Sequence, residues 1–585
     1  MSGDYIVARM RRRQAPKRSS RRRPALRLEI QRLGPLPLVN HLLARLDLER
    51  LLERFVPTRD RRCALPYARA LGVLLRSIVV EREPIYRQQE TVSTFTPEAF
   101  GLEPAQARRL RDDQIGRALD RLFDADRGSL LTAVVLKALQ GFDVSVREVH
   151  NDTTSIRFTG QYRIARGRSL RGRRAPWITY GHSKDHRPDL KQLLFILSST
   201  EDGGVPVQFR CADGSTNDGR THLASWEALC RVAGRTDFLY VADSKLCTPE
   251  AMDGIDRKRG RFVTVLPRTR REDQEFRRWI QTHEPAWEEV WNRPHPRRQG
   301  GPRDIWRVFR YPLPSREGWP VIWVWSSLLA LRHQQGRRER LARAAQELEV
   351  LARRLKASRS RLRSQREIRA RVDRILRGQK VQRYLRVRVR RESADRYVQA
   401  TRGRPGPKTR YRRIPRQRFR LEWRPDEAAI AYDRKSDGMY PLLTNERELS
   451  SREVLEAHKR QPQLEKRFEQ LKNIHEIAPV FLKNEGRIEA LFFLYFLGLL
   501  VQALLEREVR RGMQKAGIRE LPLYPEERQS RRPTAEQVLR LFNRVERHHL
   551  YSGKRCVQVF NPQLTELQRQ ILRLLGVSRR AYCKR

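Results

Sequence analysis

The feature that most constrains the fold is a switch to alternating strand and helix patterns between residues 144 and 267. The first three patterned segments are strand-like, and helices and strands then alternate; in chain order they are strand 144–158, strand 193–198, strand 205–209, helix 221–232, strand 238–242, helix 248–259 and strand 262–266. Strands at 193–198 and 238–242 are continuous apolar runs, as expected for strands buried on both faces. This order predicts an α/β fold with a mixed sheet.

Helical periodicity flanks this α/β segment on both sides. Residues 27–143 carry apolar stripes at helical spacing, most clearly at 67–80, and predict an N-terminal helical domain. After residue 446 the helical pattern resumes, and 446–511 are expected to complete the same core as 144–267. Residues 512–585 are basic and are expected to be mostly helical.

Residues 446–511 contain helix-start signals and one long apolar run. Ser450 and Glu453 have the spacing of a capping box, and Pro462 suits the first turn of a following helix. The apolar run 491–505 is short for a bilayer and contains Gln502, so it predicts a buried helix rather than a membrane span.

Residues 268–445 interrupt the core pattern and are interpreted as an insertion with strands and a long charged helical segment. Within 337–377, leucines recur every seven residues, at Leu341, Leu348, Leu355 and Leu362. Such a seam indicates a helix folded back on the protein or paired between subunits, and folding back is the commoner case. Residues 402–408 predict a mobile basic loop.

The charge of the chain indicates a polyanionic partner. Lys and Arg number 123 against 68 Asp and Glu, a formal charge of +55. Nucleic acid is the first candidate and an anionic membrane the second. Residues 1–26 hold nine Lys and Arg and one acid, which predicts a flexible basic arm ordered on DNA, or a solvated tail without a specific role.

The remaining composition excludes several classes of protein. The six cysteines form no C-x-x-C pair, which disfavours a zinc ribbon or a disulfide framework. The N-terminus lacks the apolar run of a signal peptide, so we expect an intracellular protein without a membrane partner. No glycine-rich phosphate loop occurs, which disfavours an ATP-driven machine.

Three acidic residues are candidates for chemistry. Asp152 and Asp243 lie at strand ends, and a sheet with adjacent first and fourth strands would bring them side by side. Two close carboxylates favour a divalent cation, although each Asp could instead cap a turn. Glu465 is the natural third ligand, on a helix where Phe468 and Lys472 share its face at i+3 and i+7, so that Lys472 would contact a phosphate. Such a trio can hold two Mg²⁺ ions.

Other polar residues compete with this assignment. Asp185 and Asp189 lie in a basic loop, whose Lys184 and Arg187 either contact phosphates or pair with acids of the same loop. His150 and His182 could ligate a metal, but a lone His more often packs or hydrogen-bonds. We interpret Asp218 as the cap of the helix 221–232.

Four sequence strings carry a family resemblance. They are Val-His-Asn-Asp-Thr-Thr-Ser at 149–155, Tyr-Gly-His-Ser-Lys-Asp-His-Arg-Pro-Asp-Leu-Lys-Gln at 180–192, Val-Ala-Asp-Ser at 241–244, and Asp-Gly-Met-Tyr-Pro-Leu-Leu-Thr-Asn at 437–445. The chain resembles bacterial insertion-sequence DDE transposases of the insertion-sequence-four superfamily, especially the subgroup with an extra N-terminal helical domain. In that superfamily's Tyr, Arg, Glu, Lys signature, this sequence has His458, Gln461, Glu465 and Lys472.

The resemblance implies an RNase H-like core with an insertion between Asp243 and Glu465. It implies that Asp152, Asp243 and Glu465 are catalytic and bind two Mg²⁺ ions, or Mn²⁺ in their place, and that Lys472, Lys184 and Arg187 contact DNA. The implied activity is cleavage at insertion-sequence ends and strand transfer into target DNA, by a homodimer synapsed on double-stranded DNA in the bacterial cytoplasm. The alternative is a non-catalytic DNA-binding or domesticated relative. We expect residues 27–143 to recognise the element ends, with 512–585 as the competing region.

Overall fold

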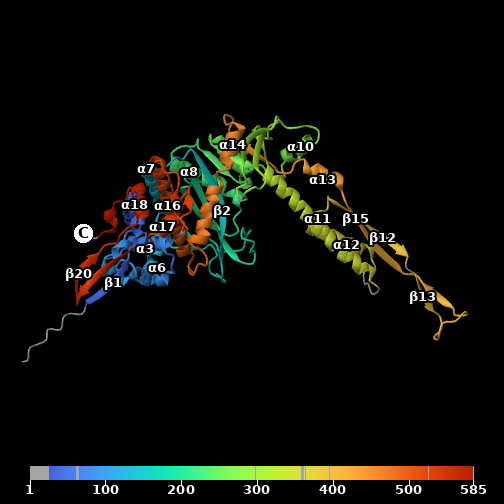
Figure 1. The fold of residues 1–585 in the computed structure, drawn as a ribbon, viewed down its shortest axis with the longest axis horizontal. Helices are drawn as coiled ribbons and strands as arrows, with labels where there is room; N and C mark the ends of the chain where they lie inside the picture. Colours follow the sequence, from blue (N-terminus) through green and yellow to red (C-terminus); the bar gives the residue numbers. More distant parts are fainter. Residues whose placement is uncertain are drawn as a thin grey trace, which may run out of the picture. The chain divides into compact units, whose positions relative to one another are not determined.

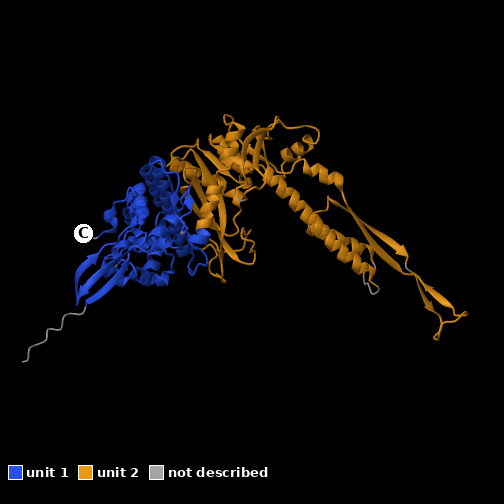
Figure 2. Cartoon of the chain, in the orientation of Figure 1, with its two compact units in different colours: residues 1–142, 169–175, 471–585 blue, residues 143–168, 176–470 orange. Residues whose placement is uncertain are grey.

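The computed structural model describes residues 26–583 except 61, 62, 64, 297, 358–361, 363, 394 and 525. The predicted basic arm at 1–26 therefore lies, apart from Leu26, outside the described residues. The chain forms two compact units, one from residues 1–142, 169–175 and 471–585 and the other from 143–168 and 176–470 (Figure 2). We call them the helical unit and the sheet unit.

The sheet unit is built on one large mixed sheet, in which Figure 1 labels β2. The sheet has nine strands among the described residues. In spatial order the strands are β6 (Pro206–Asp213), β5 (Lys191–Thr200), β2 (Glu148–Phe158), β7 (Leu239–Ala242), β8 (Arg261–Val265), β16 (Met439–Thr444), β11 (Val321–Ser326), β10 (Asp304–Arg310) and β9 (Glu288–Arg293). The pairs β2–β7 and β7–β8 are parallel and the other pairs are antiparallel. The mixed α/β fold predicted from the sequence is confirmed.

The short helices of the sheet unit connect and cover these strands. They are α8 (His222–Ala233), α9 (Pro249–Arg257), α10 (Arg271–Trp279), α13 (Glu427–Arg434), α14 (Ser451–His458) and α15 (Pro462–Glu469). The capping box predicted from Ser450 and Glu453 begins α14, and Pro462 stands in the first turn of α15. These two local predictions are confirmed.

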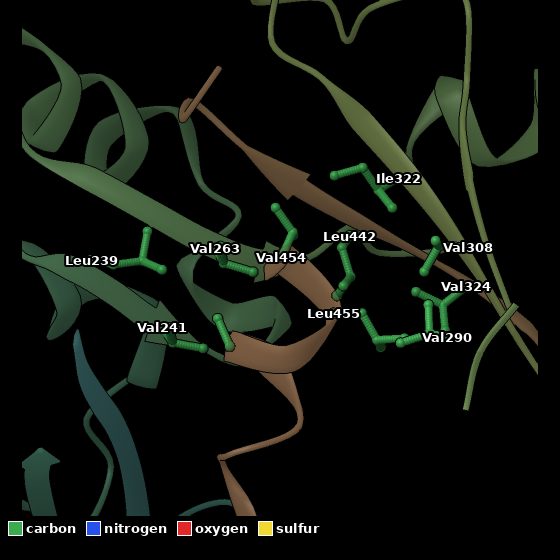
Figure 3. Close-up of a cluster of buried hydrophobic side chains, with 11 residues drawn as sticks. Leu239, Val241, Val263, Val290, Val308, Ile322, Val324, Leu442, Val454 and Leu455 are labelled. Carbon is green, nitrogen blue, oxygen red and sulfur yellow. The ribbon is translucent and has the colours of Figure 1, made fainter. Parts of the chain in front are cut away.

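Strands from the segment 268–445 extend the core sheet. Strand β16 pairs with β8 through Leu442 and Val265, so the sheet passes without a break across the predicted core boundary. Helix α14 covers this part of the sheet, and its Val454 and Leu455 pack in a buried cluster with side chains from β7, β8, β9, β10, β11 and β16 (Figure 3). Strands β9, β10, β11 and β16 of this segment thus belong to the same layer as the core, whereas the other strands of the segment form separate two-stranded sheets.

The charged segment forms a helical hairpin rather than one helix. Helix α11 (Ser327–Lys356) and helix α12 (Gln365–Gly378) pack on each other and on the two-stranded pair β12 (Leu385–Ser393) and β15 (Gln417–Pro425). Leu348 and Leu355 of the seam are buried in this cluster, with Leu341 and Leu362 partly buried beside it. The leucine seam therefore packs within the chain, as the commoner case predicted.

The helical unit is centred on a long buried helix. Helix α16 (Glu485–Lys515) contains the predicted apolar run, and around it lie α1 (Leu36–Arg45), α2 (Leu48–Phe55), α3 (Tyr67–Val80), α4 (Gln88–Ser93), α5 (Pro104–Arg109), α6 (Asp112–Asp124), α7 (Arg127–Phe142), α17 (Ala535–Phe542) and α18 (Glu566–Leu575). Within the described residues α16 is the one helix long and apolar enough to cross a membrane, and 94% of its most apolar window is buried in the structure. That burial fits the predicted core helix.

The C-terminal region is less helical than its pattern predicted. Strands β19 (Glu546–Ser552) and β20 (Arg555–Phe560) form a three-stranded antiparallel sheet with β1 (Leu26–Arg32). Strand β1 alternates apolar and polar residues, but its Leu28 and Ile30 are each 53% exposed, and β19 buries Arg547 and His549 in place of apolar residues.

Candidate active site

The sheet brings Asp152 and Asp243 together. Strands β2 and β7 run parallel, with Asn151 opposite Ala242, so the residue that follows each of these two is one of the aspartates. Strand β7 ends at Ala242, and Asp243 begins a short 3₁₀ turn at the edge of the sheet. The two carboxylates are close enough for the charge of Asp243 to raise the pKa of Asp152.

The Asp152 carboxyl lies in a partly buried, polar setting. Burial is the largest influence on it and raises its pKa, while Lys184 and the Thr153 N–H, which donates to Oδ1 at 2.6 Å, oppose that rise. Asp243 is more open, with 40% of its side chain exposed, and its Oδ1 accepts a hydrogen bond from the Lys245 N–H at 2.9 Å. Asp243 thus caps a turn as well as facing Asp152.

Lys184 supplies positive charge to this acidic group. Its Nζ lies 3.3 Å from Asp152 Oδ1 and 3.5 Å from Asp218 Oδ2, and it also donates to the Thr153 carbonyl. Burial alone would lower the pKa of Lys184, but the carboxylates of Asp152 and Asp218 raise it above its usual value. Lys184 therefore stands among the carboxylates, not with the acids of its own loop.

Asp218 differs from its predicted role. Helix α8 begins at His222 with Thr221 in the N-cap position, and the Thr221 hydroxyl donates to the Asp218 carbonyl at 2.7 Å. The Asp218 carboxylate faces Lys184 instead of the helix end. The capping interpretation was wrong because a 3₁₀ turn at Asp218–Arg220 separates this residue from the helix.

A buried His–Tyr pair borders the two aspartates and was missed from the sequence. His222 Nδ1 lies 3.2 Å from the Tyr240 hydroxyl, and its Nε2 lies 4.0 Å from Asp243 Oδ1. Burial lowers the pKa of His222 to about 4, so the imidazole is neutral at pH 7. Nothing in the local sequence pairs a residue at the start of a helix with the strand that follows it.

Glu465 lies on the surface of α15, a helix that packs against β2 and β5. Among the described residues no group of three or more His, Cys, Asp and Glu side chains is arranged to hold a metal ion. The structure therefore brings Asp152 and Asp243 together and leaves Glu465 outside a shared group.

Helix α15 is fixed to the sheet by a buried arginine. Arg467 is 2% exposed, and its guanidinium donates to the carbonyls of Gly203 and Gly204 in the turn between β5 and β6. Both glycines have positive φ, which lets the tight turn present two carbonyls in one direction. The position of Glu465 thus depends on a contact two residues away.

The segment 458–472, which carries the four signature positions, is not one regular α-helix. A π-helical turn at Gln470–Ile474 follows α15 directly, so the i, i+3, i+7 face predicted for Lys472 is interrupted after Glu469. His458 is partly buried beside Tyr440, with ring centroids 5.6 Å apart, and desolvation lowers its pKa to about 4. Gln461 occupies the N-cap position of α15.

The remaining candidates from the loop and strand have protein partners. Arg187 forms a bidentate pair with Asp189, with nitrogen–oxygen distances of 2.8 and 2.6 Å on the exposed surface. His150 Nε2 lies 2.8 Å from Glu148, whose carboxylate also binds Arg460. The sequence left two alternatives open for each residue. Arg187 pairs with an acid of its own loop rather than standing free for a phosphate. His150 hydrogen-bonds within the protein rather than standing free for a metal.

Comparisons with known proteins give limited likeness. Residues 28–136, which span most of the N-terminal helices, match a family described as "Domain of unknown function (DUF4277)". No curated protein matches the chain. A solved structure of a piggyBac transposase in a synaptic complex with hairpin DNA matches with 11% identity and a TM-score of 0.24. The match covers 50% of this chain and 60% of that one.

Proposed function

We propose that this chain is a DDE transposase that cleaves DNA at insertion-sequence ends and joins the ends to target DNA. The observation that carries the proposal is the convergence of Asp152 and Asp243 from neighbouring parallel strands. In a chain of formal charge +55, paired carboxylates beside a sheet edge suit an enzyme acting on a polyanion. Mg²⁺ held by one or two carboxylates serves in enzymes that act on phosphate substrates, nucleases among them.

An RNase H-like core is part of this proposal. The strand order β6-β5-β2-β7-β8 supports it, because the first and fourth strands of the core are neighbours. That adjacency is the condition under which the sequence predicted two carboxylates side by side.

The donor set fits a divalent cation. Asp152 and Asp243 offer hard oxygen ligands, and the contact of Lys184 Nζ with Asp152 and Asp218 marks a place where these acids require positive charge. Asp152, Asp243 and Glu465 would hold two Mg²⁺ ions, or Mn²⁺. When bound, the ions would supply an activated oxygen nucleophile and stabilise the departing oxygen.

The chain's own groups set the conditions of the reaction. Burial around Asp152 and His222 lowers the local dielectric, which strengthens interactions of the carboxylates with cations. Because His222 is neutral, it forms no ion pair with Asp243 and leaves that carboxylate available to a cation. Lys472 is proposed to contact DNA, as are Lys184 and Arg187 once they exchange their carboxylate partners for phosphates. The substrate is double-stranded DNA, and residues 27–143 are proposed to recognise its ends within a homodimer.

A non-catalytic DNA-binding protein is the second candidate. It is favoured because the described residues hold no group of three or more His, Cys, Asp and Glu side chains arranged for a metal ion, and because His458 and Gln461 replace the signature Tyr and Arg. The large positive charge alone would suffice for DNA binding.

Substitution of the three acids separates the candidates. Asp152→Asn, Asp243→Asn and Glu465→Gln should each abolish Mg²⁺-dependent cleavage of a plasmid carrying the DNA that flanks the gene, while duplex binding measured by fluorescence anisotropy persists. Asp237→Asn is the matched control, because Asp237 is an exposed acid of the same unit paired with Arg235. Absence of cleavage by the wild-type chain together with normal binding would support the second candidate.

A further inference from the structure

The sheet unit has a second notable feature besides the aspartate pair, a two-stranded ribbon rich in basic residues. Residues 385–425 hold 15 Lys and Arg against three Asp and Glu, a formal charge of +12 in 41 residues. They form the pair β12–β15 and, beyond it, the shorter pair β13 (Arg396–Gln399) and β14 (Tyr411–Ile414). We call this segment the basic ribbon.

The two faces of β12–β15 differ in chemistry. One face buries Leu385, Phe419 and Leu421 against the helical hairpin of α11 and α12. The other face is formed by alternate residues of both strands, namely Arg386, Arg388, Arg390, Glu392, Arg418, Arg420, Glu422 and Arg424. The hairpin therefore holds the ribbon with its arginine face directed to solvent, and we call this the arginine face.

Pairing across the arginine face sets like charges opposite each other. Arg386 stands opposite Arg424, and Arg390 stands opposite Arg420. Such cross-strand pairs destabilise a sheet unless an anion lies between them.

Acidic neighbours compensate only part of this face. Arg386 binds Asp426 at 2.7 Å and Arg390 binds Glu422 at 2.8 Å. Arg420 lies 3.7 Å from Glu392 and 3.9 Å from Glu422. Arg388, Arg418 and Arg424 are exposed and have no ion-pair partner within the described part of the chain. Three guanidinium groups on one face are thus available to an external anion.

The charge continues to the end of the ribbon. The loop between β13 and β14 contains Arg402, Arg404, Lys408 and Arg410 and no acid. A row of cations that extends along strands and into a loop matches a linear polyanion better than a single phosphate group. A two-stranded ribbon also fits the width of the major groove of B-DNA.

We propose that the arginine face of the basic ribbon binds the phosphate backbone of double-stranded DNA. This inference rests on the proposed function for the choice of DNA. It adds to that function a second DNA-binding surface, separate from the site of the aspartate pair. It assigns no base contacts, because guanidinium contacts to phosphates carry no sequence information.

Salt dependence of binding tests this surface. The full chain is titrated with a fluorescent 30-base-pair duplex of random sequence at several KCl concentrations, in EDTA so that no cleavage occurs. The triple variant Arg388→Gln, Arg418→Gln, Arg424→Gln should reduce the slope of log affinity against log salt by about 2.7, if each arginine neutralises one phosphate. The corresponding Arg→Lys triple should restore most of that slope.

The matched control removes the same charge from the same part of the unit. Arg338, Arg353 and Arg374 are exposed on α11 and α12, and their change to Gln should leave the slope within about 0.5 of wild type. A second variant, Arg402→Gln, Arg404→Gln, Lys408→Gln, alters only the exposed loop, so it tests the ribbon even where the strand variant folds poorly.

The results separate this inference from the proposed function. Equal slope changes in ribbon and control variants, or lost binding to anionic phosphatidylserine vesicles with unchanged DNA binding, would overturn the inference. Wild-type chain that binds DNA through the ribbon but never cleaves it would overturn the proposed function alone.

Discussion

Replacement of Arg467 by Met tests how the sheet positions the helix that carries Glu465. The guanidinium donates to the Gly203 carbonyl at 2.7 Å, to the Gly204 carbonyl at 2.9 Å and to Gln470 Oε1 at 2.7 Å. Met retains much of the apolar stem but donates no hydrogen bond. Three acceptors beside a side chain that is 2% exposed then lose this donor.

The expected cost follows from these acceptors. Each buried acceptor left without its donor costs roughly 1–3 kcal/mol, and the lower end applies where water reaches the turn, so the total is about 3 kcal/mol. A loss of that size raises the population of the detached helix by about 150-fold. Cleavage should fall with it, because Glu465 shares the helix, while DNA binding should remain.

Hydrogen–deuterium exchange measured by mass spectrometry is the appropriate assay, since a chain of two units need not unfold in one step. Peptides covering 195–213 and 462–470 should exchange faster in Arg467→Met. Arg452→Met is the matched control: Arg452 also donates to two backbone carbonyls, of Val290 and Glu289, but 43% of its side chain is exposed. Its loss should cost under about 1 kcal/mol, because water replaces the lost donor.

Equal exchange in the two variants would refute the reasoning. It would mean that burial of the Arg467 contacts adds nothing to the hold on the helix. Faster exchange in Arg467→Met with full cleavage would instead separate Glu465 from the reaction.

Three further predictions concern the sheet unit. Leu348→Ala should cost about 2–5 kcal/mol and accelerate exchange in the helical hairpin, because Leu348 is fully buried in its core; unchanged exchange there would contradict the packing. Arg337→Met should cost about 3–5 kcal/mol by leaving buried Asp437 unpaired, and adding Asp437→Asn should recover most of that cost in denaturation experiments. Burial raises the pKa of Asp152 above 3.8, so its ionisation opposes folding; Asp152→Asn should raise the unfolding temperature at pH 7, and this gain should shrink as the pH falls through the raised pKa and vanish below the ordinary value.

Features with a local physical cause could be predicted from the sequence. The helix at residues 67–80 has the bounds of α3, because its apolar stripe alone specifies a buried helix. Ser450 and Glu453 specify the start of α14 through hydrogen bonds three residues apart. The adjacency of Asp152 and Asp243 was predicted conditionally, since it needed the strand order that the structure supplies.

Features that depend on contacts distant in sequence could not be predicted. Pairing of β16 with β8 extends the core sheet into the presumed insertion, and no local pattern announces which strands will meet. The prediction that Glu465 and Lys472 share one helical face assumed continuous α-helical turns. The π-helical turn after Glu469 interrupts them. His222 reaches the site through its contact with Tyr240, a tertiary relation without a motif.

The leucine seam and the basic ribbon have one physical explanation. A two-stranded ribbon is marginal in water by itself, and arginines opposite arginines weaken it further. The hairpin of α11 and α12 offsets this cost by burying the apolar face of β12–β15 against Leu348 and Leu355. A seam that stabilises only a helix pair would not require a charged sheet on its surface. The seam is therefore the support that holds the arginine face, which we propose binds DNA, extended at the surface.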